Sequence, residues 1–178
     1  IGEGDDSVQV ELDAVDGCPR YTCAVVSDVS VGPSPSWISK RLEAMGVRSI
    51  NNVVDCTNYV MLELGNPLHA FDRSVLADSV VRISWAEDDE SVRTLDGGEH
   101  SLLPGRDLCI RDGQSIIALA GVMGGEDSEV RSDTSVLFLE SAHFAPGPVR
   151  ATAHRCKLGT ESSYRFARGV DPGLPLRA

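Results

Sequence analysis

The chain has 178 residues, 42% of them hydrophobic and 24% charged, a composition typical of one folded domain with a sizeable core. It has no apolar run near the roughly 18 residues of a membrane-spanning helix, and its first ten residues are too acidic and polar for a signal peptide. The net charge of −11 argues against DNA binding, and against any protein that holds nucleic acid by broad neutralisation of phosphates.

The five cysteines are scattered and include no C-x-x-C pair, a pattern that predicts reduced thiols in a cytoplasmic protein and no structural metal site. The chain lacks an initiator Met and stops without a clear final element. We therefore expect it to be a piece of a longer polypeptide.

The first quarter of the chain predicts a linker, two strands and a helix. Residues 1–7 are polar and acidic, whereas residues 8–12 and 21–29 are rich in β-branched side chains and predict strands. The helix is expected to have Ser36 as its N-cap and to stop at Gly46.

The second predicted helix begins near Asn51 or Asn52 and ends at Gly65. Asn58 lies about 100° round the helix from Thr57, which belongs to an apolar stripe. The stripe repeats with helical spacing and consists of Val53, Thr57, Val60, Met61 and Leu64.

A break follows this helix, because the Asn66-Pro67 pair cannot continue it. We therefore expect His69 on a loop, and Asp72 as the cap of a short turn behind it. Taken alone, His69 is either a packed histidine or a catalytic one, and the other three histidines offer no metal-ligand spacing to it.

From Val80 onward the pattern changes to strands and ends in a helix from about Pro148 to Lys157. Turns are expected at residues 96–98 and at Asp112-Gly113. This order predicts an α+β fold with packed antiparallel sheets. The predicted strands cover residues 80–85, 91–95, 108–110, 115–121 and 135–142.

A glycine-rich segment, LAGVMGGEDSEV, covers residues 119–130 and contains Gly121 and Gly124. It has neither the G-K-[ST] of a phosphate-binding loop nor the spacing of a dinucleotide fingerprint. Two interpretations stay open, a turn that needs positive φ, or a wall where the backbone closely approaches a ligand.

Glu140 ends the strand SVLFLE and shares one face with Val136 and Phe138, because side chains alternate along a strand. An unpaired buried carboxylate is costly. Glu140 therefore either reaches water at the strand end or meets a hydrogen-bond donor.

Residues 150–168 carry five basic side chains against one acid, Glu161. Such a strip on an acidic body is either a solvated helix face or a surface that meets one end of a nucleic acid. The five are Arg150, Arg155, Lys157, Arg165 and Arg168.

Five segments together resemble the central B3/B4 editing module of the β subunits of bacterial phenylalanyl-tRNA synthetases, over about residues 17–172. The segments are the long stretch from CPRYTCAVV to GNPLHAFD, then TLDG, IALAGVMGGEDSEV, LESAHF and SSYRFARGVDP. The resemblance implies a three-layer β/β/α fold with the helices on one side. It also divides the chain into residues 1–16, a linker and first strand, and residues 17–178, a B3/B4-like tRNA-editing domain.

The resemblance implies that the module hydrolyses tyrosine wrongly attached to tRNA(Phe), within an enzyme that attaches phenylalanine to that tRNA. Its partners would be the tRNA acceptor end, the α subunit and the remaining β-subunit domains, with no membrane. The segment itself would hold no cofactor, whereas ATP and Mg would bind elsewhere in the synthetase. The implied catalytic residues are His69, Thr57 and Asn58, and the implied substrate-binding residues are Glu140, Gly121, Gly124, Thr160, Ser162 and Arg48.

Two departures from the family motif Asp-Ala-Ser-Tyr-Arg-Phe-Glu-Arg-Gly matter for the site. Ser162 replaces an alanine and adds a hydroxyl to the pocket wall, and Ala167 replaces a glutamate and removes an ion pair. Two alternatives therefore stand beside the editing hypothesis. One is a non-catalytic structural module of the same synthetase, and the other is a free-standing trans-editing protein.

Overall fold

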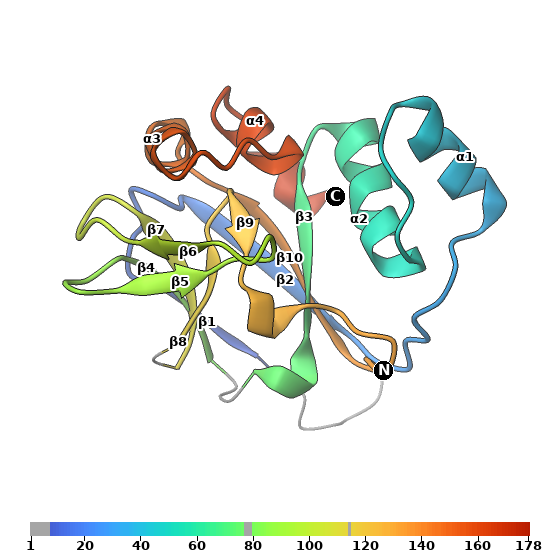
Figure 1. The fold of residues 1–178 in the computed structure, drawn as a ribbon, viewed down its shortest axis with the longest axis horizontal. Helices are drawn as coiled ribbons and strands as arrows, with labels where there is room; N and C mark the ends of the chain where they lie inside the picture. The colour runs from blue at the N-terminus through green and yellow to red at the C-terminus, as the bar shows by residue number, and fades with distance from the viewer. Residues whose placement is uncertain (1–7, 77–79, 114) are drawn as a thin grey trace.

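A computed structural model describes residues 8–76, 80–113 and 115–178, so the linker expected at residues 1–7 lies outside the described residues. The fold is α+β, as predicted, and contains a five-stranded, a three-stranded and a two-stranded sheet. The four α-helices lie along one side of the sheets, at the top of the view in Figure 1.

The five-stranded sheet has the strand order β1-β4-β7-β8-β9. All neighbours are antiparallel except β1 and β4, whose parallel pairing was not expected. Parallel neighbours need a long crossover, and here β2, both early helices and β3 provide it. The strands are β1 (Gln9–Leu12), β4 (Val80–Trp85), β7 (Leu108–Asp112), β8 (Ser115–Leu119) and β9 (Met123–Gly124).

The three-stranded sheet places β10 (Leu137–His143) between β2 (Arg20–Val26) and β3 (Leu68–Asp72), antiparallel to both. In this register Glu140 lies opposite Cys23 on one side and His69 on the other. The two-stranded sheet is a hairpin of β5 (Ser91–Arg93) and β6 (Glu99–Ser101); the first strand and the turn at residues 96–98 were predicted, but β6 was not.

The prediction of His69 on a loop is wrong, because His69 is the second residue of β3. The Asn66-Pro67 break does end the helix, but the next five residues pair at once with β10. Nothing local predicts this strand, since its hydrogen-bond partners lie about seventy residues later in the chain. Asp72 caps the turn η1 (Arg73–Val75) as expected, accepting a hydrogen bond from Ser74 N at 2.8 Å.

The two early helices are α1 (Ser36–Ala44) and α2 (Asn52–Leu64). The predicted ends of α2 are confirmed, because Asn51 Oδ1 accepts hydrogen bonds from the first helical N–H groups and Gly65 has a φ of +83°. In α1 the N-cap is Pro35, one residue before the predicted Ser36, whose side chain makes no capping bond. Leu64, at the end of the predicted stripe of α2, is exposed.

The late helices are α3 (Pro146–Cys156) and α4 (Glu161–Phe166), so the predicted helix begins two residues earlier and a second one follows it. Buried Asp107 binds α3 to the strands through hydrogen bonds from Thr152 and Arg155. The hydrophobic core lies between the two larger sheets and under these helices, with Phe71, Phe138, Phe144 and Phe166 almost fully buried. The remaining short turns are η2 (Glu126–Ser128) and η3 (Leu174–Leu176).

Candidate functional site

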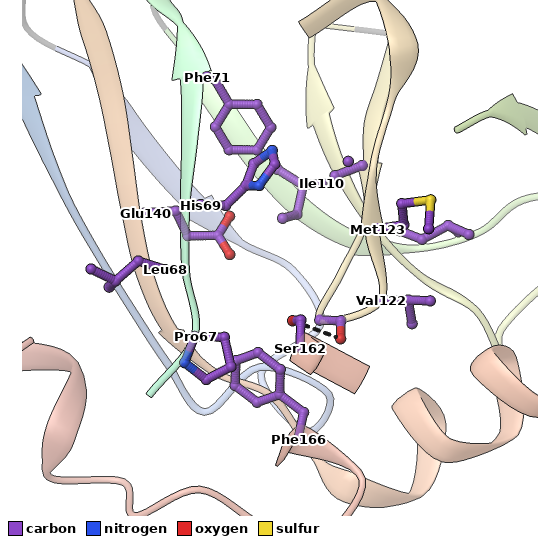
Figure 2. A pocket seen from close by; sticks show the side chains of 14 residues that line it. Pro67, Leu68, His69, Phe71, Ile110, Val122, Met123, Glu140, Ser162 and Phe166 are labelled. Carbon is purple, nitrogen blue, oxygen red and sulfur yellow. Dashed lines mark hydrogen bonds between the residues drawn. The ribbon is translucent and has the colours of Figure 1, made fainter. Parts of the chain in front are cut away.

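A cavity of two adjoining chambers, which share lining residues, lies between the three-stranded sheet, the β8–β9 turn and the start of α4. Figure 2 shows the inner chamber. The inner chamber holds about 400 Å³ of empty space, partly open to solvent, and Glu140 lies on its wall. The outer chamber holds about 1040 Å³ and extends towards α2. Both are lined by Pro67, Leu68, His69, Val122, Met123, Gly124 and Ser162.

The cavity brings together eight of the nine residues that the sequence singled out. Glu140 and Gly121 line the inner chamber, and His69, Gly124 and Ser162 line both. The outer chamber adds Thr57, Asn58 and Thr160. Arg48 does not join them, because it is exposed on the connection between α1 and α2 and lines neither chamber.

Glu140 is 6% exposed, and its carboxylate points into the inner chamber (Figure 2). Oε2 accepts a hydrogen bond from the hydroxyl of Tyr21, on β2, at 2.9 Å. Burial raises the pKa of Glu140 from 4.5 to about 7, and the Tyr21 hydrogen bond opposes that rise. A carboxylate with this pKa changes charge close to neutral pH.

His69 is the cross-strand neighbour of Glu140, and its ring meets Phe71 edge-on, with 4.4 Å between the ring centroids. Protein surrounds the imidazole, although part of its surface stays open to the cavity. Burial lowers the pKa of His69 from 6.5 to about 4. The ring is therefore neutral at pH 7 and acts as a base or a hydrogen-bond partner rather than as a cation.

The two glycines of the site have different roles. Gly121 has a φ of +69°, which satisfies the turn interpretation. Gly124 has no such φ, but a Cβ at this position would lie 2.8 Å from Cε1 and Nε2 of His69. The backbone at Gly124 is thus the surface on which the His69 ring rests, and a side chain there would displace the ring.

The start of α4 closes the cavity with two hydroxyls that bind backbone carbonyls. Thr160 is the N-cap of α4 and donates to Val122 O at 2.8 Å. The Ser162 hydroxyl, which replaces the alanine of the family motif, donates to Gly121 O at 3.1 Å, as the dashed line in Figure 2 shows. The added hydroxyl therefore lies on the cavity wall and binds the glycine turn.

Thr57 and Asn58 approach the outer chamber from α2. The Thr57 hydroxyl donates to Val54 O at 2.8 Å, one turn back along the helix. The Asn58 amide makes no hydrogen bond with any of the residues that the structure describes, so it is available to a ligand in the outer chamber.

The family model for the B3/4 domain matches residues 17–178. The chain belongs to the B3/4 domain family. Its resemblance to this module of phenylalanyl-tRNA synthetase β subunits, inferred from the sequence, is confirmed.

Curated relatives of this B3/4 domain are phenylalanine--tRNA ligase β subunits. The protein from Geobacter sulfurreducens is 55% identical over 161 residues, which are 90% of this chain and 20% of the relative. The protein from Thermotoga maritima is 48% identical over 170 residues, 94% of this chain and 21% of the relative. The chain thus spans about a fifth of the length of these relatives.

The fold of the B3/4 domain also matches a solved structure, an N-terminal fragment of the phenylalanyl-tRNA synthetase β subunit from Pyrococcus horikoshii. The match has a TM-score of 0.56 with 14% sequence identity, and it covers 87% of this chain and 50% of that one. At this identity the likeness shows the fold, and the α+β prediction is confirmed.

The basic strip of the B3/4 domain divides into paired and unpaired charges. Arg155 and Arg165 form ion pairs with Asp107 and Glu161. Arg168 stacks on the ring of Tyr164 at 3.5 Å, and Arg150 donates to Ala167 O. Arg150, Tyr164 and Arg168 line a surface depression that shares Thr160 and Glu161 with the outer chamber.

Sequence reasoning missed two residues of this B3/4 domain that shape the site. Tyr21 was assigned only to a strand, although its hydroxyl meets Glu140. Asp55, fully buried on α2, accepts hydrogen bonds from Ser34, Ser49 and Ile50 N and so fixes the segments around the helix start. Its position in the first turn, where helices favour acids, was the available signal.

Two further properties concern only the described part of the B3/4 domain. Its His, Cys, Asp and Glu side chains form no group of three or more that would hold a metal ion. None of its helices is long and apolar enough to cross a membrane.

Proposed function

We propose that this B3/4 domain is the editing module of a phenylalanyl-tRNA synthetase β subunit, and that it hydrolyses the ester of tyrosine wrongly attached to tRNA(Phe). The observation that carries the proposal is the Glu140 carboxylate on the wall of a chamber whose other lining side chains, apart from His69 and Ser162, are apolar. The names of the relatives support the assignment to this synthetase. Phenylalanine activation, with its ATP and Mg, belongs to other parts of that enzyme, and the α subunit and the remaining β-subunit domains are the partners of this domain.

Selectivity follows from the one hydroxyl by which tyrosine differs from phenylalanine. An apolar pocket rejects an added hydroxyl only about 10²-fold, whereas a site built to bind that hydroxyl rejects the analogue without it by up to about 10⁴–10⁵-fold. With phenylalanine bound, the Glu140 carboxylate would be shielded from water without gaining a partner. Glu140 therefore accepts the hydrogen bond of the tyrosine hydroxyl.

Hydrolysis of an aminoacyl ester needs a placed water and a donor for the developing oxyanion, and no covalent nucleophile. Neutral His69 accepts a hydrogen bond from the attacking water or from the terminal ribose. Among the described residues the N–H of Gly121 has no protein acceptor, and it serves as the oxyanion donor. Asn58 and Thr57 hold the ester from the α2 side.

The tRNA end reaches the outer chamber along the depression between α3 and α4. Arg150 and Arg168 contact phosphates there, and Tyr164 offers a ring for base stacking. The loss of the motif glutamate at Ala167 leaves a carbonyl, and no carboxylate, as the partner of Arg150. Arg48 is exposed and lies outside both chambers, so a contact with the tRNA end would be made beyond the cavity.

The direct test is deacylation of tyrosyl-tRNA(Phe) by the intact synthetase carrying Glu140→Ala or His69→Ala. Both variants should hydrolyse tyrosyl-tRNA(Phe) more slowly than the parent. In Glu140→Ala, the selectivity for tyrosyl over phenylalanyl esters should fall by a larger factor than the basal rate of hydrolysis. Glu63→Ala, on the exposed side of α2, is the matched control. Parental rates for both cavity variants would refute the assignment.

The alternative of a non-catalytic module rests on Ser162 and Ala167. It predicts an unchanged level of tyrosine misacylation when the cavity is blocked. The alternative of a free-standing trans-editing protein predicts a parent open reading frame no longer than the editing domain itself.

A further inference from the structure

Tyr21 lies beside Glu140 on the neighbouring strand β2, two residues from Cys23, the register partner of Glu140. The two side chains are therefore diagonal neighbours on one face of the sheet. The Tyr21 hydroxyl donates to Oε2 at 2.9 Å, and its ring packs against the hydrophobic core. Among the described residues this is the one hydrogen bond that the Glu140 carboxylate receives.

We propose that Tyr21 is a positioning residue of the cavity: its phenol occupies Oε2 of Glu140 and so reserves Oε1 for the hydroxyl of the bound ligand. A carboxylate has two oxygens and about four acceptor positions. With one oxygen held by a rigid aromatic side chain, the other keeps a fixed direction into the inner chamber (Figure 2). This inference rests on the proposed function and adds to it the residue that orients the acceptor.

The surroundings of Glu140 make this hydrogen bond its main support. The groups that face it are Tyr21 and Cys23 on β2, Cys18 before that strand, and His69 on β3. His69 is neutral at pH 7, and burial raises the pKa of both thiols, so none of these groups supplies a positive charge. Of the interactions of Glu140, the Tyr21 hydrogen bond is the one that lowers its pKa against the effect of burial.

Tyr21→Phe tests the proposal, because it keeps the ring in the core and removes the hydroxyl. The probes are two non-hydrolysable adenosine analogues in which tyrosine or phenylalanine is joined to the ribose through an amide. Their affinities for the intact synthetase are measured from pH 5.5 to 9, with the aminoacylation site saturated by phenylalanine. Tyr59→Phe is the matched control, because Tyr59 lines neither chamber and its hydroxyl accepts a hydrogen bond from Arg41 rather than meeting a cavity residue.

In the parent, the preference for the tyrosyl analogue should fall as the pH drops through about 7, where Glu140 takes up its proton. In Tyr21→Phe the midpoint should rise by about one pH unit, because a hydrogen bond to a charged group is lost. The preference at pH 7 should fall about fivefold as a consequence, because the ionised fraction of Glu140 falls from about one half to about one tenth. A merely structural role for Tyr21 would change both affinities and leave the midpoint in place.

Each contrary result is distinct. A parent without tyrosyl preference overturns the proposed function and this inference with it. If the parent prefers the tyrosyl analogue and Tyr21→Phe shows the same preference with the same pH midpoint, this inference is overturned and the proposed function stands. Tighter tyrosyl binding by Tyr21→Phe also overturns it, since the phenol would then compete with the ligand for Glu140.

Discussion

Glu140→Gln removes the charge of the buried carboxylate and keeps its shape. Folding raises the pKa of Glu140 from 4.5 to about 7, so the folded state holds this proton more tightly than the unfolded state does. The ionisation of Glu140 therefore leaves the free energy of unfolding unchanged below about pH 4.5, and it lowers that free energy progressively as the pH rises to about 7. A pKa change of this size corresponds to up to about 3 kcal/mol.

The variant should thus raise the free energy of unfolding by up to about 3 kcal/mol at pH 8 and by little at pH 4. The amide oxygen still accepts the Tyr21 hydrogen bond, so that contact is retained. The assay is urea unfolding of the 178-residue chain at pH 4, 6 and 8, with Glu63→Gln as the exposed control. An equal gain at pH 4 and pH 8 would refute the reasoning, because the charge would then not be its source.

The same substitution should lower the discrimination of tyrosyl from phenylalanyl esters about tenfold, because a neutral acceptor binds a hydroxyl more weakly than a charged one. Greater stability would then accompany poorer selectivity. A variant that is more stable at pH 8 yet fully selective would show that the ligand hydroxyl binds elsewhere.

Four further expectations concern separate features. In urea unfolding, the free energy of unfolding of the parent should fall by up to about 3 kcal/mol as the pH drops from 6.5 to about 4, and His69→Gln should not show this fall. Gly124→Ala should slow tyrosyl-tRNA hydrolysis about 10²-fold by displacing the His69 ring, whereas Gly159→Ala, with nothing within 4 Å, should not. Arg150→Ala should reduce the salt dependence of tRNA binding by about one phosphate contact in a filter-binding titration. Asn51→Ala should cost about 1 kcal/mol in urea unfolding, because α2 loses its cap.

Helix α2 shows what local sequence determines. Asn51 and Gly65 set its ends through hydrogen bonds and a backbone conformation that involve only near neighbours. The β7–β8 hairpin and the turn at residues 96–98 are equally local and were also predicted, whereas strand β6 was not. The strand at His69 was not, because its five residues become a strand only through pairing with β10.

The site residues likewise include some that local sequence predicts and some that depend on distant parts of the chain. Strand alternation identified Glu140 as a carboxylate on an apolar face, and a close approach of the backbone was one of two interpretations that the glycine run left open. Tyr21 was not predicted as a site residue, because its hydrogen bond to Glu140 joins residues 119 positions apart and depends on the register of β2 against β10. The resemblance grouped Arg48 with the pocket, whereas the chain direction after α1 leaves it on the surface.

Glu140 and His69 are cross-strand neighbours, and the same burial changes their pKa values in opposite directions, to about 7 and about 4. The usual order of protonation is reversed, because the carboxyl takes up its proton before the imidazole does. Between pH 4 and 7 the pair carries little charge, which keeps the cost of burying both groups low. Near neutral pH Glu140, the proposed acceptor of the tyrosine hydroxyl, is therefore the group of the pair that changes charge, and His69 acts only as an acceptor. The rate of ester hydrolysis should thus change near pH 7 in the parent, and Glu140→Gln should abolish that change while His69→Gln retains it.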